Sequence, residues 1–305
     1  MSLRGELADP GSGSATIIVS LDTRRYEAKL IEKYDPDGSL KERDLPLDAN
    51  VPVKMLVEAA EKKGTATPGE VSAARSFIGE VLYLASKISF DIACSVSILA
   101  TTAAVPTALW VKQATHLLGY LKKRLRLNPR VEYYPRTPGQ PAEMDMCGFS
   151  DASFGNATKA RSQVSWIIFS NSGMVNYHSG VSGGVMLSTT HSEAIAMSDL
   201  TKQMLHQSML EKQLGHKAVR HILTDNKAQL HLAWGSCPRR SAHQEWRARH
   251  IQAVVAAGVL KAAHVSTKVN PADVGSKMMR SKSDFVRLRS IFLQVDGVDR
   301  LRPWY

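Results

Sequence analysis

The stretch "GFSDASFGN" (residues 148–156) places an acid, Asp151, at the end of a short apolar run and follows it with small, turn-forming residues. Together with the preceding "EMDMC" it predicts a strand that ends near this acid. The stretch contains no Lys or Arg to neutralise the carboxylate. The counter-charge must therefore come from elsewhere in the chain or from a bound cation.

The segments after Asp151 alternate between strand and helix patterns. "SQVSWIIFS" and "GMVNYHSG" predict two strands that a turn at 171–173 connects. A long helix at 189–215 follows, and then a strand ("VRHILTD"), two helices, a strand ("VLKAAHVS") and a final helix at "NPADVGSKM". In the long helix the residues with the spacing of a buried stripe are Ala196, Met197, Leu200 and Met204. This order predicts a mixed α/β sheet.

Three more acids share the position of Asp151 at the end of an element. Glu193 lies in the first turn predicted for the long helix, Asp225 ends "VRHILTD", and Asp273 lies in the first turn of the last helix. Strand ends and neighbouring helix starts can converge on one edge of a sheet, where four carboxylates repel one another unless divalent cations bind. Oxygen-only ligands favour Mg²⁺ or Mn²⁺ over Zn²⁺. Two such ions roughly 3.5 to 4 Å apart hydrolyse phosphodiesters in known enzymes.

Each acid also has a structural interpretation. Thr190-x-x-Glu193 fits a capping box, in which the glutamate only satisfies backbone donors. Asp225 precedes Asn226 and could be an N-cap, and Asp273 would be favourable near any helix start. The shared position of the four acids at element ends favours catalysis.

The first part of the chain predicts a mostly helical segment. A short strand pattern at 15–20 leads into a helix at 23–34, and strong helical patterns fill 70–127. The Pro-rich residues 128–141 predict a linker and place a domain boundary near residue 140. The expected organisation is a flexible N-terminus at 1–14, a helical segment at 15–127, the linker at 128–141, a second domain at 142–280 and a C-terminal tail at 281–305.

Composition points to a polyanionic partner or to an ordinary basic surface. Among 305 residues, 39 Lys plus Arg exceed 28 Asp plus Glu, a formal charge of +11. Candidate phosphate contacts, which could equally be solvated charges, are Lys122, Lys123, Arg124, Arg161, Arg247 and Arg249. Three cysteines without C-x-x-C spacing favour a reducing, intracellular compartment. The sequence contains no membrane-spanning run and no targeting signal, so we expect a cytoplasmic or nuclear protein.

Four motifs carry a resemblance to a known family. "GFSDASFGN", "VMLSTTHSEAIAMSDLTKQML", "LTDNKAQLHLA" and "VNPADVGSKMM" resemble, in the same order, motifs of the ribonuclease H domain of copia-type retrotransposon Pol polyproteins. Upstream, "RSFIGEVLYLASKISFDIACSVSILA" and "PTALWVKQATHLLGYLKKRL" are similar to the thumb and connection segment that links that family's polymerase to its ribonuclease H. The resemblance spans about residues 15–295.

The resemblance implies a fold and an activity. It implies a ribonuclease H-like mixed five-stranded sheet with flanking helices, preceded by a smaller, mostly helical segment. It implies hydrolysis of the RNA strand of RNA:DNA hybrids by two Mg²⁺ or Mn²⁺ ions. The positions that match the family's metal-binding carboxylates are Asp151, Glu193, Asp225 and Asp273. Expected partners are the hybrid and other Pol or capsid components of the same element, with no membrane.

Departures from the family pattern keep a second function open. The sequence has no Tyr-x-Asp-Asp, so we expect a Pol fragment without the polymerase palm. "SGVSGGV" (179–185) is neutral where the family carries lysines, and Ser153 and Phe154 replace an acid and a tryptophan. His264 is expected at a core or strand position and is not assigned as a proton shuttle. The alternative is a catalytically inactive or domesticated remnant that binds nucleic acid without cleaving it.

Overall fold

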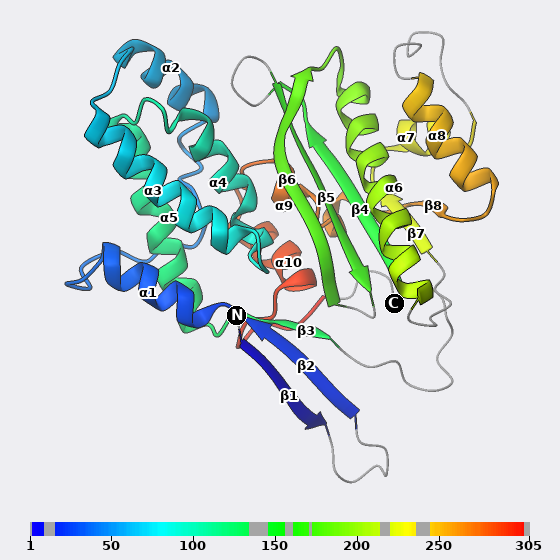
Figure 1. The fold of residues 1–305 in the computed structure, drawn as a ribbon, viewed down its shortest axis with the longest axis horizontal. Helices are drawn as coiled ribbons and strands as arrows, with labels where there is room; N and C mark the ends of the chain where they lie inside the picture. Colours follow the sequence, from blue (N-terminus) through cyan, green and yellow to red (C-terminus); the bar gives the residue numbers. More distant parts are fainter. Residues whose placement is uncertain are drawn as a thin grey trace.

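The computed structural model describes residues 2–8, 16–133, 146–155, 161–170, 173–213, 220–235 and 245–301. Its helices α1 to α5 lie on one side of a five-stranded sheet, α6 to α8 lie on the other side, and a small three-stranded sheet lies below them in Figure 1. Among the helices that the structure describes, none combines the length and the apolar composition needed to cross a bilayer.

The central sheet is mixed. Its strands are β4 (Met146–Ser153), β5 (Arg161–Ser170), β6 (Gly173–Val185), β7 (Arg220–Thr224) and β8 (Lys261–His264). They lie in the order β6-β5-β4-β7-β8, in which β5 is antiparallel to both neighbours while β4, β7 and β8 are parallel. This strand order, with helices on both faces, confirms the predicted ribonuclease H-like fold class.

Helix α6 (Thr189–Gln213) covers one face of the sheet. Met197, Leu200 and Met204 are fully buried in a core cluster that α7 (Lys227–Ala233) and α8 (Glu245–Ala256) complete. This is the stripe that the spacing of the apolar residues predicts. A Cβ at Gly148 would lie 2.6 Å from Leu200 Cδ1, so the glycine allows α6 to lie close to β4.

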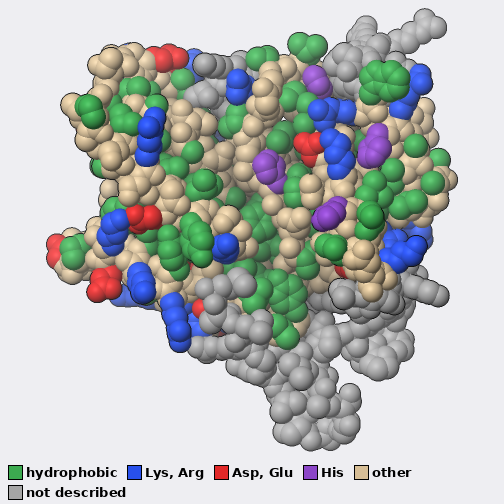
Figure 2. Space-filling model, viewed as in Figure 1, with side chains coloured by type: hydrophobic (Ala, Val, Ile, Leu, Met, Phe, Trp, Pro, Cys, Tyr) green, Lys and Arg blue, Asp and Glu red, His purple; other side chains and the backbone are tan. Residues whose placement is uncertain are grey.

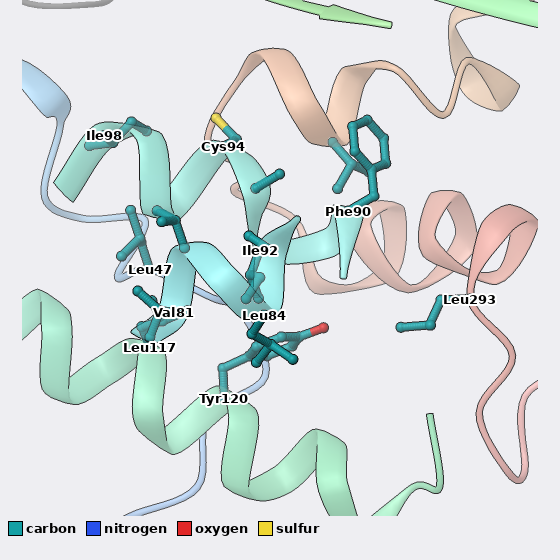
Figure 3. Packing of buried hydrophobic residues seen from close by; sticks show 14 of the residues in the cluster. Leu47, Val81, Leu84, Phe90, Ile92, Cys94, Ile98, Leu117, Tyr120 and Leu293 are labelled. Carbon is teal, nitrogen blue, oxygen red and sulfur yellow. The ribbon is translucent and has the colours of Figure 1, made fainter. Parts of the chain in front are cut away.

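The other face of the sheet packs against the first part of the chain. Helix α4 (Phe90–Thr102) lies there with the short α9 (Asp273–Ser276) and α10 (Lys282–Phe292). The ring of Phe90 lies 5.1 Å from those of Tyr177 and Phe292. Figure 3 shows Phe90 among the buried side chains of this cluster, which extends from Leu30 to Leu293. The helical segment and the sheet therefore share one hydrophobic core.

The remaining helices form the outer part of the helical segment. They are α1 (Arg24–Tyr34), α2 (Val53–Lys63), α3 (Pro68–Ala85) and α5 (Ala108–Arg126). Helix α3 begins with a complete capping box between Thr67 and Glu70 and has a proline at its first position. These local signals explain why the segment at 68–85 is helical.

Three elements differ from the predicted organisation. In the predicted flexible N-terminus, β1 (Ser2–Ala8) pairs with β2 (Thr16–Asp22), and β2 pairs with β3 (Val131–Tyr133) from the predicted linker. Residues 9–15 and 134–141 lie outside the described residues. Helix α10 occupies the predicted tail because Phe285, Leu288, Ile291 and Phe292 are buried at helical spacing.

Candidate active site

Three of the four predicted acids come together at one end of the sheet. Asp151 is on β4, Asp225 directly follows β7, and Asp273 begins α9. Each offers a carboxylate oxygen that lies within 4.8 Å of the other two. The parallel pairing of β4 with β7 places their carboxyl ends side by side, and α9 packs against β4. The three aspartates therefore converge at one edge of the sheet, as their positions at the ends of strands and helices predicted.

The fourth acid, Glu193, lies beside this cluster on α6. Its side chain is buried, and its Oε2 has no hydrogen-bond partner among the described residues. Burial, together with the charges of Asp151 and Asp225, raises the pKa of Glu193 to about 9. The electrostatic field of the three aspartates thus reaches Glu193.

The capping interpretations of two acids are wrong. Helix α6 starts at Thr189, and the Ser188 hydroxyl accepts a hydrogen bond from the His191 amide, so Thr190 is not the cap residue of a box with Glu193. Asn226, not Asp225, caps α7 by accepting hydrogen bonds from two amides. The carboxylates of Glu193 and Asp225 therefore do not cap a helix and can belong to the acidic site.

Two neighbouring side chains that the sequence did not indicate position the aspartates. The buried Asn270 amide donates to Asp225 Oδ1 at 3.1 Å and to the Ser150 carbonyl at 3.2 Å. The Ser276 hydroxyl donates to Asp151 Oδ2. Because both donors are buried, they fix the carboxylates with little freedom.

A cation that the sequence did not indicate lies at the edge of the cluster. Lys277 Nζ is 3.4 Å from Asp151 Oδ2 and 3.1 Å from Asp273 Oδ1. Burial would lower the pKa of Lys277, but the charges of Asp151 and Asp273 outweigh it and raise the pKa. Burial and the charge of Asp151 raise the pKa of Asp273 to about 8, despite Lys277. One ammonium group therefore does not neutralise the cluster.

The donor set fits a hard divalent cation. The clustered atoms are carboxylate oxygens, the ligands that Mg²⁺ and Mn²⁺ prefer, and Glu193 adds a buried oxygen without a hydrogen-bond partner among the described residues. The repulsion that raises the pKa values of Glu193 and Asp273 would be relieved by a bound divalent ion. The cluster can therefore hold a metal ion.

These pKa shifts give an expected pH dependence for the metal-free protein. Because Glu193 and Asp273 have raised pKa values in the folded state, the unfolded chain releases these protons at lower pH, and ionisation then destabilises the fold. Stability should fall as pH rises from about 4 towards about 9. Urea unfolding across this interval should show a smaller fall for Glu193→Gln, and Mg²⁺ should reduce the fall in the wild type. Equal pH profiles in both proteins would contradict this explanation.

His264 ends β8, next to the site. It is exposed, and its Nε2 lies 3.3 Å from the carbonyl oxygen of Asp225. The expected strand position is confirmed. The side chain contacts the backbone of Asp225 and not its carboxylate.

The basic end of α5 pairs with acids of the helical segment. Arg124 is 1% exposed and forms ion pairs of 2.6 Å with Glu27 and Asp91. Its predicted phosphate contact is wrong, because the guanidinium is enclosed by protein. Lys122 donates to Asp35 and to two carbonyl groups, and Lys123 pairs with Asp44 at 2.6 Å. The basic run at this helix end thus connects α5 to α1 and to the segment before α2.

The other predicted phosphate contacts lie on the sheet and α8. Arg161 begins β5, Arg247 lies 3.5 Å from Asp199, and Arg249 stacks over the exposed ring of Trp246. On the face shown in Figure 2, Lys, Arg and His side chains gather over the part formed by the sheet and α6. Nucleic-acid contacts by these three arginines remain a prediction.

A groove of about 710 Å³ opens beside the acids, between the helical segment and the sheet. Its lining includes Ser276 and Lys277, which contact Asp151, and basic side chains of Lys54 and Arg280. Val53 from α2 and Ile98 from α4 also line it. Both parts of the chain therefore line the groove.

Comparisons with known proteins give structural neighbours only. No family model and no curated protein matches the sequence. A ribonuclease H1 isolated from compost, LC11-RNase H1, shares 14% identity over 42% of this chain and 90% of its own, with a TM-score of 0.34. The same enzyme in complex with an RNA/DNA hybrid gives 14% identity, 43% and 93% coverage, and a TM-score of 0.33. Ribonuclease H1 from Halobacterium salinarum NRC-1 gives 15% identity, 43% and 93% coverage, and a TM-score of 0.32. The fold class of this chain rests on its own strand order.

Proposed function

We propose that this chain is a metal-dependent ribonuclease H that hydrolyses the RNA strand of RNA:DNA hybrids. The proposal depends above all on the cluster of Asp151, Asp225 and Asp273 within 4.8 Å at the end of a ribonuclease H-like sheet, with Glu193 beside it. The bound ions would be Mg²⁺ or Mn²⁺, as a pair. The hybrid is the substrate class that the resemblance of the four motifs implies.

The four acids would hold the metal ions together. Asp151, Asp225, Asp273 and Glu193 would hold the ions, which when bound lower the pKa of a water molecule and stabilise charge on the leaving oxygen. Ser276 and Asn270 keep two of these carboxylates in place. Hybrid recognition would depend on backbone shape and 2′-OH groups more than on base sequence.

We further propose that the chain derives from the C-terminal part of a copia-type Pol polyprotein. The order of the four ribonuclease H motifs and the upstream motifs supports this origin. In this proposal residues 15–127 correspond to the thumb and connection segment, and residues 142–280 to the ribonuclease H domain. The shared core between α4 and the sheet agrees with a connection segment that packs on its nuclease.

A second candidate function is nucleic-acid binding without cleavage. Two observations favour it: Lys277 already contacts two of the acids, and residues 179–185 of β6 carry no charge. In that case the cluster would be a structural remnant, and the basic arginines would carry the remaining function.

A cleavage assay on a panel of duplexes tests the proposed function. The purified chain would receive labelled RNA:DNA, RNA:RNA and DNA:DNA duplexes of one sequence with Mg²⁺, with Mn²⁺ and with EDTA. We expect cuts in the RNA strand of the hybrid, with either metal and not with EDTA. A folded protein that binds the hybrid and leaves it uncut across both metal titrations would favour the second candidate.

Binding by α8 should depend on salt. Replacing both Arg247 and Arg249 with alanine should weaken hybrid affinity and reduce its log–log salt slope by roughly one for each phosphate that these side chains neutralise. Arg126→Ala is a matched control, because this exposed arginine lies at the end of α5 and pairs with Glu42. Fluorescence anisotropy at several salt concentrations gives the slopes. Identical slopes in all three proteins would make Arg247 and Arg249 ordinary solvated charges.

A further inference from the structure

Lys277 is placed where a single side chain faces two of the clustered acids. It directly follows α9 and caps its C-terminus, so its position is fixed relative to Asp273, four residues earlier. Its side chain is 39% exposed, whereas those of Asp151 and Asp273 are 5% and 8% exposed. The ammonium group therefore covers the solvent side of buried carboxylates.

Lys277 offsets part of the negative charge of the site. Among the described residues, Lys277 is the cation that forms ion pairs with Asp151 and Asp273. Asp225 and Glu193 add two further carboxyl groups whose charges act on the same centre. Buried like charges at this distance destabilise the fold unless a cation compensates them.

We propose that Lys277 is a built-in counter-cation, which stabilises the metal-free site and which a divalent ion must displace from Asp151 and Asp273. The inference rests on the proposed function in one respect, that the acids bind metal. Lys277 is thus a positioning residue that sets metal affinity, and its side chain acts on the site through the carboxylates.

Geometry and electrostatics make the two cations competitors. A divalent ion held by these carboxylates would need the oxygens that the ammonium group now contacts at 3.1 and 3.4 Å, and the two cations would repel each other. The lysine also lines the groove of about 710 Å³ beside the site, which gives its flexible chain space to turn away. Metal binding then breaks the ion pairs of Lys277 with Asp151 and Asp273, and this cost weakens the observed affinity of the site for the metal.

The test measures metal affinity in the absence of substrate. Mn²⁺ would be titrated into the full chain by calorimetry and by electron paramagnetic resonance, for the wild type, Lys277→Gln and Lys277→Arg. Lys261→Gln, an exposed lysine on β8, is the matched control. We expect Lys277→Gln to bind Mn²⁺ about tenfold more tightly, which corresponds to about 1.4 kcal/mol. Lys277→Arg keeps the charge and should remain within about threefold of the wild type, as should the control.

Thermal unfolding supplies a second readout, because the loss of a merely structural lysine would lower the melting temperature without changing the gain from Mn²⁺. Lys277→Gln should melt below the wild type without metal and gain more from saturating Mn²⁺, since bound metal stabilises the folded state by mass action. Unchanged or weaker Mn²⁺ affinity in Lys277→Gln, with wild-type binding intact, would overturn the inference while leaving the proposed function in place. Mn²⁺ binding by Lys277→Gln but not by the wild type would support the inference and count against metal-dependent cleavage by the natural chain.

Discussion

Asp151→Asn, Glu193→Gln, Asp225→Asn and Asp273→Asn are each expected to reduce hybrid cleavage on the order of 100-fold or more. In the proposed function the four carboxyl groups hold one metal centre, so removing any one would misplace the metal ions, the nucleophilic water or the scissile phosphate. Asparagine and glutamine keep the shape of the side chain and remove its charge. Single-turnover rates with labelled hybrid and Mg²⁺ measure the loss.

The control for this series is Asp37→Asn, an exposed acid in the turn after α1. It should cleave at the wild-type rate, and circular dichroism should show that all variants fold. Glu193→Gln is the most informative member, because Glu193 lies outside the cluster of three. If it cleaves as fast as the wild type, Glu193 is not a metal ligand; if all four variants remain active, the site is elsewhere.

Arg124→Met is expected to destabilise the protein by about 3 to 5 kcal/mol, because it leaves Glu27 and Asp91 buried without their counter-charge. Arg124 also donates to Ser89, and Tyr120 in the same network accepts a hydrogen bond from Arg289 of α10. One guanidinium thus connects α1, α4 and α5, and the network continues to α10.

Arg126→Met is the matched control for Arg124→Met. Arg126 is two residues away on the same helix, but its side chain is 72% exposed and it pairs with Glu42 at the surface. Its loss should cost about 0 to 1 kcal/mol. Urea unfolding of both variants gives the difference. Similar losses in the two proteins would show that the buried network contributes little net stability.

The sequence predicted the sheet and the acids because both depend on local patterns. Period-two strands and the stripe of Met197, Leu200 and Met204 identify the elements and their buried faces. Acids at the ends of those elements then converge, because parallel strands β4 and β7 end at one edge. Predicting these elements and the acids at their ends therefore required no knowledge of contacts between distant residues.

The sequence could not predict features that depend on distant partners. A basic run at the end of a helix is typical of solvated charges, and nothing local indicates that Arg124 meets Glu27, 97 residues away. Strand β1 forms by pairing with β2, and its mixed polar and apolar sequence did not indicate a strand. Lys277 follows Asp273 by four residues in the helix predicted at "NPADVGSKM", a spacing that brings two side chains together. Its contact with Asp151 on β4 joins distant parts of the chain, and no local pattern indicates it.

Anomalous X-ray scattering from crystals soaked in Mn²⁺ would show whether the acids at the ends of β4 and β7 form a divalent metal site, on which the proposed chemistry depends. We expect anomalous density bounded by the carboxylates of Asp151, Asp225 and Asp273, with the Lys277 ammonium moved away from Asp151. We also expect the density to disappear in Asp225→Asn. Wild-type crystals at saturating Mn²⁺ without density at these carboxylates, and with Lys277 still paired to Asp151 and Asp273, would contradict the metal site.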